Sequence, residues 1–129
     1  MHINEVERIL RDSVSGQENR YEIKRYCDHI CCESDFVLLR DGLEYAYLKF
    51  DAAGQMSRKA MGIHEEKMGT ASFYVVLRDT DAFIPTSLSC KVYPRNNMKS
   101  VFECDTDCLL EKIEGYHSTL SIPMTIEDV

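Results

Sequence analysis

The sequence predicts a single α+β domain with two N-terminal helices, an antiparallel sheet of about five strands and one late helix. Three observations support this prediction. Apolar residues recur three and four positions apart near the N-terminus, runs rich in β-branched and aromatic residues fill the middle, and helical spacing returns near the end. No repeat, low-complexity tract or linker interrupts the 129 residues, which fit one domain. We therefore expect one domain that spans residues 1–129.

The first segment predicts an amphipathic helix. Its apolar residues fall on one helical face and are Ile3, Val6, Ile9, Leu10 and Val14. Asn4 is the expected N-cap, with Glu7 three residues later, as in a capping box. Gly16 and the small polar residues around it are expected to end this helix.

Residues 21–32 predict a second helix. Apolar residues in a strand would alternate, but here they fall three and four positions apart. They are Ile23, Tyr26, Cys27, Ile30 and Cys31.

The middle of the chain predicts the sheet. The expected strands are residues 36–39, 43–50, 72–78 and 87–93, with a further strand in residues 98–103. Asp41-Gly42 between the first two supplies the positive φ angles that a tight hairpin needs. Leu88, Cys90 and Val92 alternate with polar residues, which indicates one solvated face, as antiparallel sheets allow.

The connections and the C-terminal region complete the expected fold. Residues 51–70 have no sustained period and predict a long connection with a short helix near 57–61. A helix is expected over residues 107–114, with Asp105 or Thr106 as its cap and Gly115 as its end. Residues 118–124 are expected to add a short edge strand, since Pro123 is tolerated only at an edge or a strand end.

The formal charge of −7 is concentrated near the C-terminus. Residues 103–129 hold seven acidic residues and one lysine, a net charge of −6, whereas the first 102 residues hold 15 acids and 14 bases. This asymmetry disfavours direct binding to a nucleic-acid backbone and permits a basic protein partner. The alternative interpretation is a solvated acid-rich face that keeps the protein in solution. An acidic face of this kind can also mimic a nucleic acid toward a nuclease or another nucleic-acid-binding enzyme.

The six cysteines leave three interpretations open, which are buried core thiols, zinc ligands and redox chemistry. Cys27 and Cys31 lie four residues apart, as do Cys104 and Cys108, a spacing that a zinc-stabilised adaptor could use. The apolar stripe of residues 21–32 already accounts for the first pair, because free cysteine is often buried. We therefore expect reduced core thiols and no metal or other cofactor, in a cytoplasmic protein, because no secretory signal or membrane span is recognisable.

The alternative of a small enzyme or ligand-binding domain depends on three residues. His64 beside Glu65 could act as a general base, and Cys108 would lie in the first turn of a helix, where the dipole favours a thiolate. Asp105 and Asp107 oppose that effect by repulsion. No nucleophile elbow, phosphate-binding loop or dinucleotide fingerprint is present.

We therefore expect a non-enzymatic acidic binding protein. The closest functional type is an inhibitor, immunity or antitoxin-like protein that masks a basic site on a protein partner. Tyr45 and Tyr47 are expected on one face of their strand, and Tyr93 on a polar face, where aromatic anchors would contact a partner. The expected partner-binding residues are Asp107, Glu111, Glu114, Tyr45, Tyr47 and Tyr93.

Overall fold

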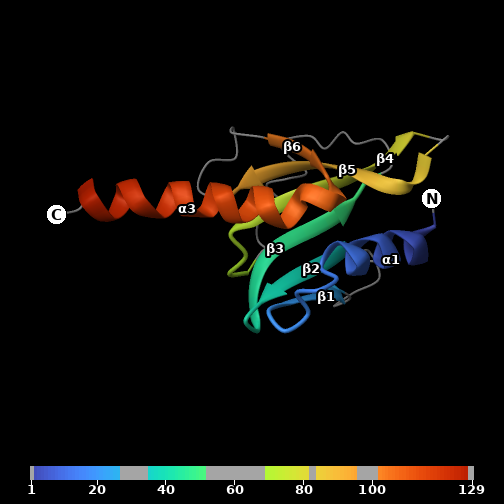
Figure 1. Cartoon of the computed structure of the whole chain (residues 1–129), viewed down its shortest axis with the longest axis horizontal. Coiled ribbons are helices and arrows are strands. Elements are labelled where there is room, and N and C mark those ends of the chain that lie inside the picture. The colour runs from blue at the N-terminus through green and yellow to red at the C-terminus, as the bar shows by residue number, and fades with distance from the viewer. Residues whose placement is uncertain (1, 27–34, 52–68, 82–83, 96–101, 128–129) are drawn as a thin grey trace.

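The computed structural model describes residues 2–26, 35–51, 69–81, 84–95 and 102–127. They form an α+β domain with one N-terminal helix, a six-stranded mixed sheet and one C-terminal helix (Figure 1). In chain order the elements are α1 (Ile3–Ser13), β1 (Tyr21–Arg25), β2 (Asp35–Arg40), β3 (Leu43–Phe50), β4 (Phe73–Asp81), β5 (Ile84–Pro94), β6 (Phe102–Asp105), the 3-10 helix η3 (Thr106–Cys108) and α3 (Leu109–Glu127).

The strands lie in the sheet in the order in which they occur along the chain. Every neighbouring pair is antiparallel except β3 and β4, which run parallel, with Ala46 opposite Phe73 and Phe50 opposite Leu77. The prediction of a purely antiparallel sheet is therefore wrong at this junction. A parallel pair needs a long crossover, and the chain between Phe50 and Phe73 is long enough to provide one.

The predicted hairpin between β2 and β3 is confirmed. Asp41 has φ 53° and Gly42 has φ 80°, and Arg40 pairs with Leu43 around them. Two consecutive positive φ angles match the twist of the flanking strands. The pairing of β2 with β3 contains one irregularity, a shift of register by one residue between Leu38 and Leu39.

The predicted helix over residues 21–32 is wrong where the structure describes it, because residues 21–25 form strand β1. Tyr21 and Ile23 are buried whereas Glu22 and Lys24 are exposed, which is the alternation of a strand with one solvated face. Tyr26 continues the pairing, since its N–H donates to the carbonyl of Asp35 over 3.0 Å.

Helices α1 and α3 cover the same face of the sheet and enclose the main core (Figure 1). Val6 and Leu10 from α1 and Ile113 from α3 are fully buried in it. The predicted N-cap of α1, Asn4, is wrong, because His2 takes that position and its Nδ1 accepts from the N–H of Asn4 at 3.1 Å. The helix therefore begins at Ile3, earlier than the capping-box pattern indicated.

Helix α3 is longer than the sequence predicted. It continues through Gly115 to Glu127 and extends past the sheet (Figure 1), so the predicted stop at Gly115 and the predicted strand over 118–124 are both wrong. Glycine inside a helix costs only about 1 kcal/mol relative to alanine, which is too little to end it by itself. Among the described residues, no helix combines the length and apolar character that crossing a bilayer requires.

The opposite face of the sheet carries a second, smaller buried cluster. Tyr47, Ala71, Tyr74 and Val76 form it, and Tyr26 and Tyr93 pack against it. The rings of Tyr47 and Tyr74 stack with centroids 5.7 Å apart, because the two residues are paired in register across β3 and β4. The sheet therefore buries side chains on both faces.

Candidate functional site

Four exposed carboxylates follow one another where the sheet ends and α3 begins. Glu103 and Asp105 lie on the edge strand β6, Asp107 lies in η3, and Glu111 lies in the first turn of α3. We call these four residues the acidic surface. Two of them, Asp107 and Glu111, were predicted as partner-binding residues.

The local sequence explains why these acids are displayed. Phe102 and Cys104 pack against the core, so the intervening side chains of the short strand face solvent. Thr106 and Leu109 are buried and anchor the turn from β6 into α3. The chain is thereby fixed on its apolar side and presents its acidic side outward.

Asp105 does not cap the helix in the predicted way. It takes the cap position of η3 with extended backbone angles, but its side chain makes no capping hydrogen bond. Its carboxylate instead accepts a hydrogen bond from the Cys108 thiol, which raises the pKa of Cys108, and Glu111 adds to that rise. Cys108 therefore lies close enough to both Asp105 and Glu111 for their charges to act on its thiol.

Basic side chains balance only part of this charge. Lys91 Nζ lies 4.0 Å from Glu103 Oε1, a half-exposed pair whose contribution to stability is small. Lys112 is the other basic residue on this part of the chain. Within the described residues, neither Asp107 nor Glu111 forms an ion pair.

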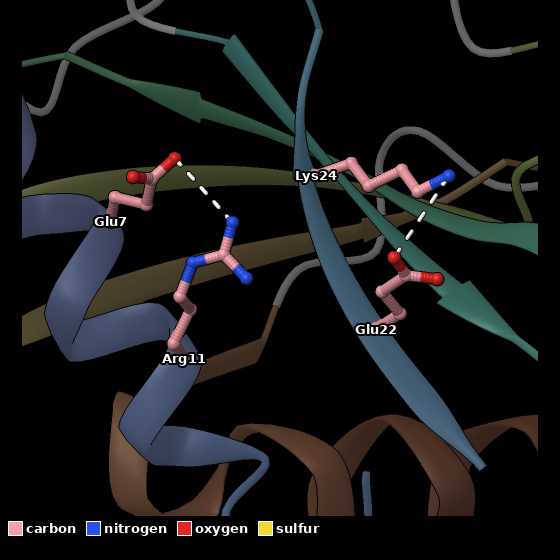
Figure 2. Close-up of polar contacts among 4 residues, drawn as sticks. All are labelled: Glu7, Arg11, Glu22 and Lys24. Atoms are coloured by element: carbon pink, nitrogen blue, oxygen red, sulfur yellow. Dashed lines mark ion pairs between the residues drawn. The ribbon is translucent and has the colours of Figure 1, made fainter. Parts of the chain in front are cut away.

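The charges near the N-terminus are arranged differently. Figure 2 shows Glu7 paired with Arg11 on α1, at 3.7 Å, and Glu22 paired with Lys24 on β1, at 3.9 Å. Arg20 lies 3.9 Å from Asp41 in the same half of the chain. Acids and bases thus neutralise one another there, and the excess negative charge is left at the C-terminal side of the sheet.

Glu114, the third acid predicted to bind a partner, has a structural contact. The hydroxyl of Tyr21 on β1 donates a hydrogen bond to Glu114 Oε1. Burial of Tyr21, and next this hydrogen bond, raise the pKa of its hydroxyl well above the ordinary value of 10.0. Glu114 is only partly exposed, and its hydrogen bond with Tyr21 connects α3 to the edge strand β1.

Tyr45 and Tyr47 do not stand together on an exposed face, so that prediction is wrong. Tyr45 is 6% exposed and belongs to the main core, whereas Tyr47 is 1% exposed and lies in the cluster on the opposite face. The register shift opposite Glu44 and Ala46 breaks the simple alternation of β3. Neither tyrosine is available as a partner anchor.

Tyr93, the third predicted aromatic residue, lies near the acidic surface. It is half-buried and its ring is 6.4 Å from that of Tyr74. Burial, and then the charge of Glu103, raise the pKa of Tyr93. Tyr93 is therefore the one predicted aromatic residue that the structure brings close to a carboxylate of the surface.

The structure describes only one of the three residues of the enzyme alternative, Cys108. His64 and Glu65 lie outside the described residues, and the raised pKa of Cys108 opposes thiolate formation. A hollow on the sheet is lined by Val76, Arg78, Ser89, Cys90, Lys91 and Glu103. Cys108, the only one of the three predicted catalytic residues that the structure describes, is not among them.

The zinc alternative is tested only in part. Cys27 and Cys31 lie outside the described residues, while Cys104 and Cys108 lie on β6 and η3. Among the residues described, no three or more His, Cys, Asp or Glu side chains converge in a way that could hold a metal ion. Cys104 instead stands opposite Cys90 of β5.

Two groups of residues were missed at the level of sequence. One is the buried Asp35, which contacts Tyr47 and Lys49, and the other is the pair formed by Cys90 and Cys104. The hairpin at Asp41-Gly42 could have revealed the contacts of Asp35, because it places the start of β2 beside the end of β3. The register shift, however, moves the residue opposite Asp35 by one position, to Lys49, so counting back from the turn gives the wrong partner.

Comparison with known proteins gave no match. This holds for protein-family models, for curated proteins and for solved structures.

Proposed function

We propose that this chain is a non-enzymatic acidic binding protein that masks a basic site on a protein partner, as an inhibitor, immunity protein or antitoxin does. The observation that carries the proposal is the acidic surface, in which four exposed carboxylates follow one another along β6, η3 and the start of α3. Charges of one sign raise the rate of encounter with a surface of the opposite sign.

The placement of these acids on an edge strand supports a selective role. An exposed edge offers unpaired backbone groups and tends to pair with other strands. β6 has only four residues, and Glu103 and Asp105 occupy both of its outward positions. A second copy of the chain would be repelled by like charge, whereas a basic partner would be attracted.

The test compares two triple variants that remove the same charge from different places. In the first, Glu103→Gln, Asp107→Asn and Glu111→Gln neutralise the acidic surface. Asp105 is kept because it interacts with the Cys108 thiol, and Glu114 is kept because it accepts the hydrogen bond from the Tyr21 hydroxyl.

The control removes three exposed acids of the N-terminal half through Asp12→Asn, Glu18→Gln and Glu22→Gln. Both variants therefore have the same net charge, and they differ only in where the charge is lost.

The partner is first captured from an extract of the native host on immobilised wild-type chain, identified and purified. Association is then measured at low and high salt. We expect the surface variant to associate severalfold more slowly at low salt, with a difference that shrinks as salt screens the charges, while the control stays near wild type. Equal rates for the two variants, or rates that do not depend on salt, would contradict the proposal.

A further inference from the structure

Cys90 and Cys104 face each other across the last two strands. The register of β5 and β6 places them directly opposite, between the pairs Ser89 with Asp105 and Lys91 with Glu103. Opposite residues of antiparallel strands have Cα atoms about 4.5 to 5.5 Å apart, which falls inside the range that a disulfide spans. Both cysteines are free thiols in the structure.

We propose that Cys90 and Cys104 form an oxidisable dithiol, which a hydroperoxide converts into a disulfide that fastens the edge strand β6 to β5. The proposal rests on the cross-strand pairing of these two residues and on their different accessibility. Cys90 is 1% exposed, while Cys104 is half-buried and can be reached from solvent. The proposed dithiol does not depend on the proposed binding function.

The surroundings assign a different role to each sulfur. Cys104 is the more exposed of the two sulfurs, whereas Cys90 is 1% exposed. The interaction with Cys90 lowers the pKa of Cys104, and the positive charge of Lys112 adds to that effect, although burial and Asp105 oppose it. The interaction with Cys104, together with burial, raises the pKa of Cys90. Exposure and the direction of both shifts therefore make Cys104 the sulfur that reacts first, with Cys90 as its partner.

The chemistry balances in two steps. The Cys104 thiolate attacks one oxygen of the hydroperoxide, the O–O bond breaks, and Cys104 becomes a sulfenic acid while the other oxygen leaves as hydroxide or alkoxide. The sulfur of Cys90 then attacks the sulfur of the sulfenic acid. The S–S bond forms, the S–O bond breaks, and the Cys90 proton and the departing hydroxide leave as water. Two thiols are oxidised by two electrons and one peroxide is reduced.

Cys108 provides a matched comparison within the same segment. It is half-buried like Cys104, but its hydrogen bond to Asp105 raises its pKa, and it has no place in the register between β5 and β6. A difference in reactivity between Cys104 and Cys108 therefore reports their different neighbours, the Cys90 thiol in one case and Asp105 in the other.

The experiment treats the reduced full-length chain with about one equivalent of hydrogen peroxide and then blocks the remaining thiols with an alkylating reagent. Trypsin separates Cys90, in residues 79–91, from Cys104 and Cys108, in residues 100–112. We expect these two peptides to become linked, with Cys104 joined to Cys90 and Cys108 alkylated. A reducing agent should reverse the link.

Three variants define the roles of the sulfurs. Cys104→Ser should lose the linked peptide, and Cys108→Ser should form it at the wild-type rate. Cys90→Ala should leave the sulfenic acid on Cys104 without its partner, so that dimedone traps it or further peroxide converts it to the sulfinic acid. The folded state of each variant is checked by circular dichroism, and Cys90→Ser serves as a second variant if the alanine variant is unfolded.

The pH dependence of oxidation tests the role of Cys104 in the wild-type chain and in a Lys112 variant. The oxidation rate of the wild-type chain should rise with pH at a lower midpoint than that of an ordinary cysteine, and Lys112→Gln should move that midpoint upward. A main product that links Cys104 to Cys108, or direct conversion of Cys104 to the sulfinic acid while Cys90 stays alkylatable after unfolding, would overturn the proposal.

Discussion

Lys49 Nζ lies 2.8 Å from Oδ1 of Asp35, in an ion pair that joins β3 to β2 inside the domain. The side chain of Asp35 is fully buried and that of Lys49 is 15% exposed. The hydroxyl of Tyr47 also donates a hydrogen bond, to Oδ2 of Asp35. A buried carboxylate is costly unless such donors compensate it, so the three side chains act as one unit.

We expect Lys49→Met to lower the free energy of unfolding by about 3 kcal/mol, because it leaves the Asp35 carboxylate buried with one donor fewer. The control is Lys91→Met, which removes the half-exposed pair with Glu103 and should cost less than about 1 kcal/mol. Urea unfolding of both variants measures the difference. Similar small losses would show that the Asp35 site admits water when Lys49 is absent.

Tyr21 and Glu114 supply a second test, which separates structure from binding. Glu114→Ala should lower the free energy of unfolding by about 1.5 kcal/mol, since the part-buried Tyr21 hydroxyl loses its carboxylate acceptor, whereas Glu114→Gln keeps an acceptor and should cost less. In a Tyr21→Phe background, Glu114→Ala should cost little. Undiminished loss in that background would mean that Glu114 acts through other contacts.

Alkaline pH should destabilise the fold. Burial is the largest cause that raises the pKa of both Tyr21 and Tyr74 above the ordinary 10.0, so the unfolded chain releases these protons before the folded chain does. Their contribution to stability is complete below about pH 10 and is lost as pH rises toward the folded-state pKa. The loss for one fully shielded group is at most about 1.4 kcal/mol per pH unit, and solvent screening makes it smaller for the part-buried hydroxyl of Tyr21.

Urea midpoints between about pH 9 and 11 measure this loss, because that interval spans the ordinary tyrosine pKa. Tyr21→Phe and Tyr74→Phe should each make the dependence on pH less steep. Unchanged slopes in both variants would contradict the assignment.

Two glycines should respond in opposite directions to replacement by alanine. An added Cβ would meet no atom within 4 Å at Gly42 or at Gly115, so only the backbone decides the outcome. Gly42→Ala forces φ 80° on an L-residue and should destabilise by about 1 kcal/mol. Gly115→Ala lies inside α3 and should stabilise by about 0.5 to 1 kcal/mol. Thermal unfolding of both variants tests the pair, and destabilisation by Gly115→Ala would indicate strain in α3 at that position.

The sequence predicted elements whose signal is local. Asp41-Gly42 marked a hairpin because positive φ angles restrict which residues can form it, and β3 was predicted with its observed bounds, Leu43–Phe50. β1 was missed because only Tyr21 and Ile23 show its alternation, and the apolar residues that follow resemble a helical face. A strand of five residues has too few alternating positions to outweigh the helical spacing of the residues that follow it.

The candidate site was predictable only in part, for a related reason. The excess of acids near the C-terminus is a property of composition, and the exposure of Asp107 and Glu111 agrees with the predicted acidic face. The contact of Glu114 with Tyr21 joins residues 93 positions apart, and the burial of Tyr45 depends on a register shift. Contacts of that range depend on the tertiary structure, which a periodic pattern in one segment does not encode.

The single parallel junction between β3 and β4 has a consequence for the order of folding. It divides the sheet into two antiparallel units, β1–β3 and β4–β6, in which each strand pairs with its neighbour along the chain. Such short-range pairing closes small loops and forms quickly, whereas the parallel pair must bring Ala46 to Phe73 across a long loop. We therefore expect the two halves of the sheet to form early and their joining to limit the folding rate.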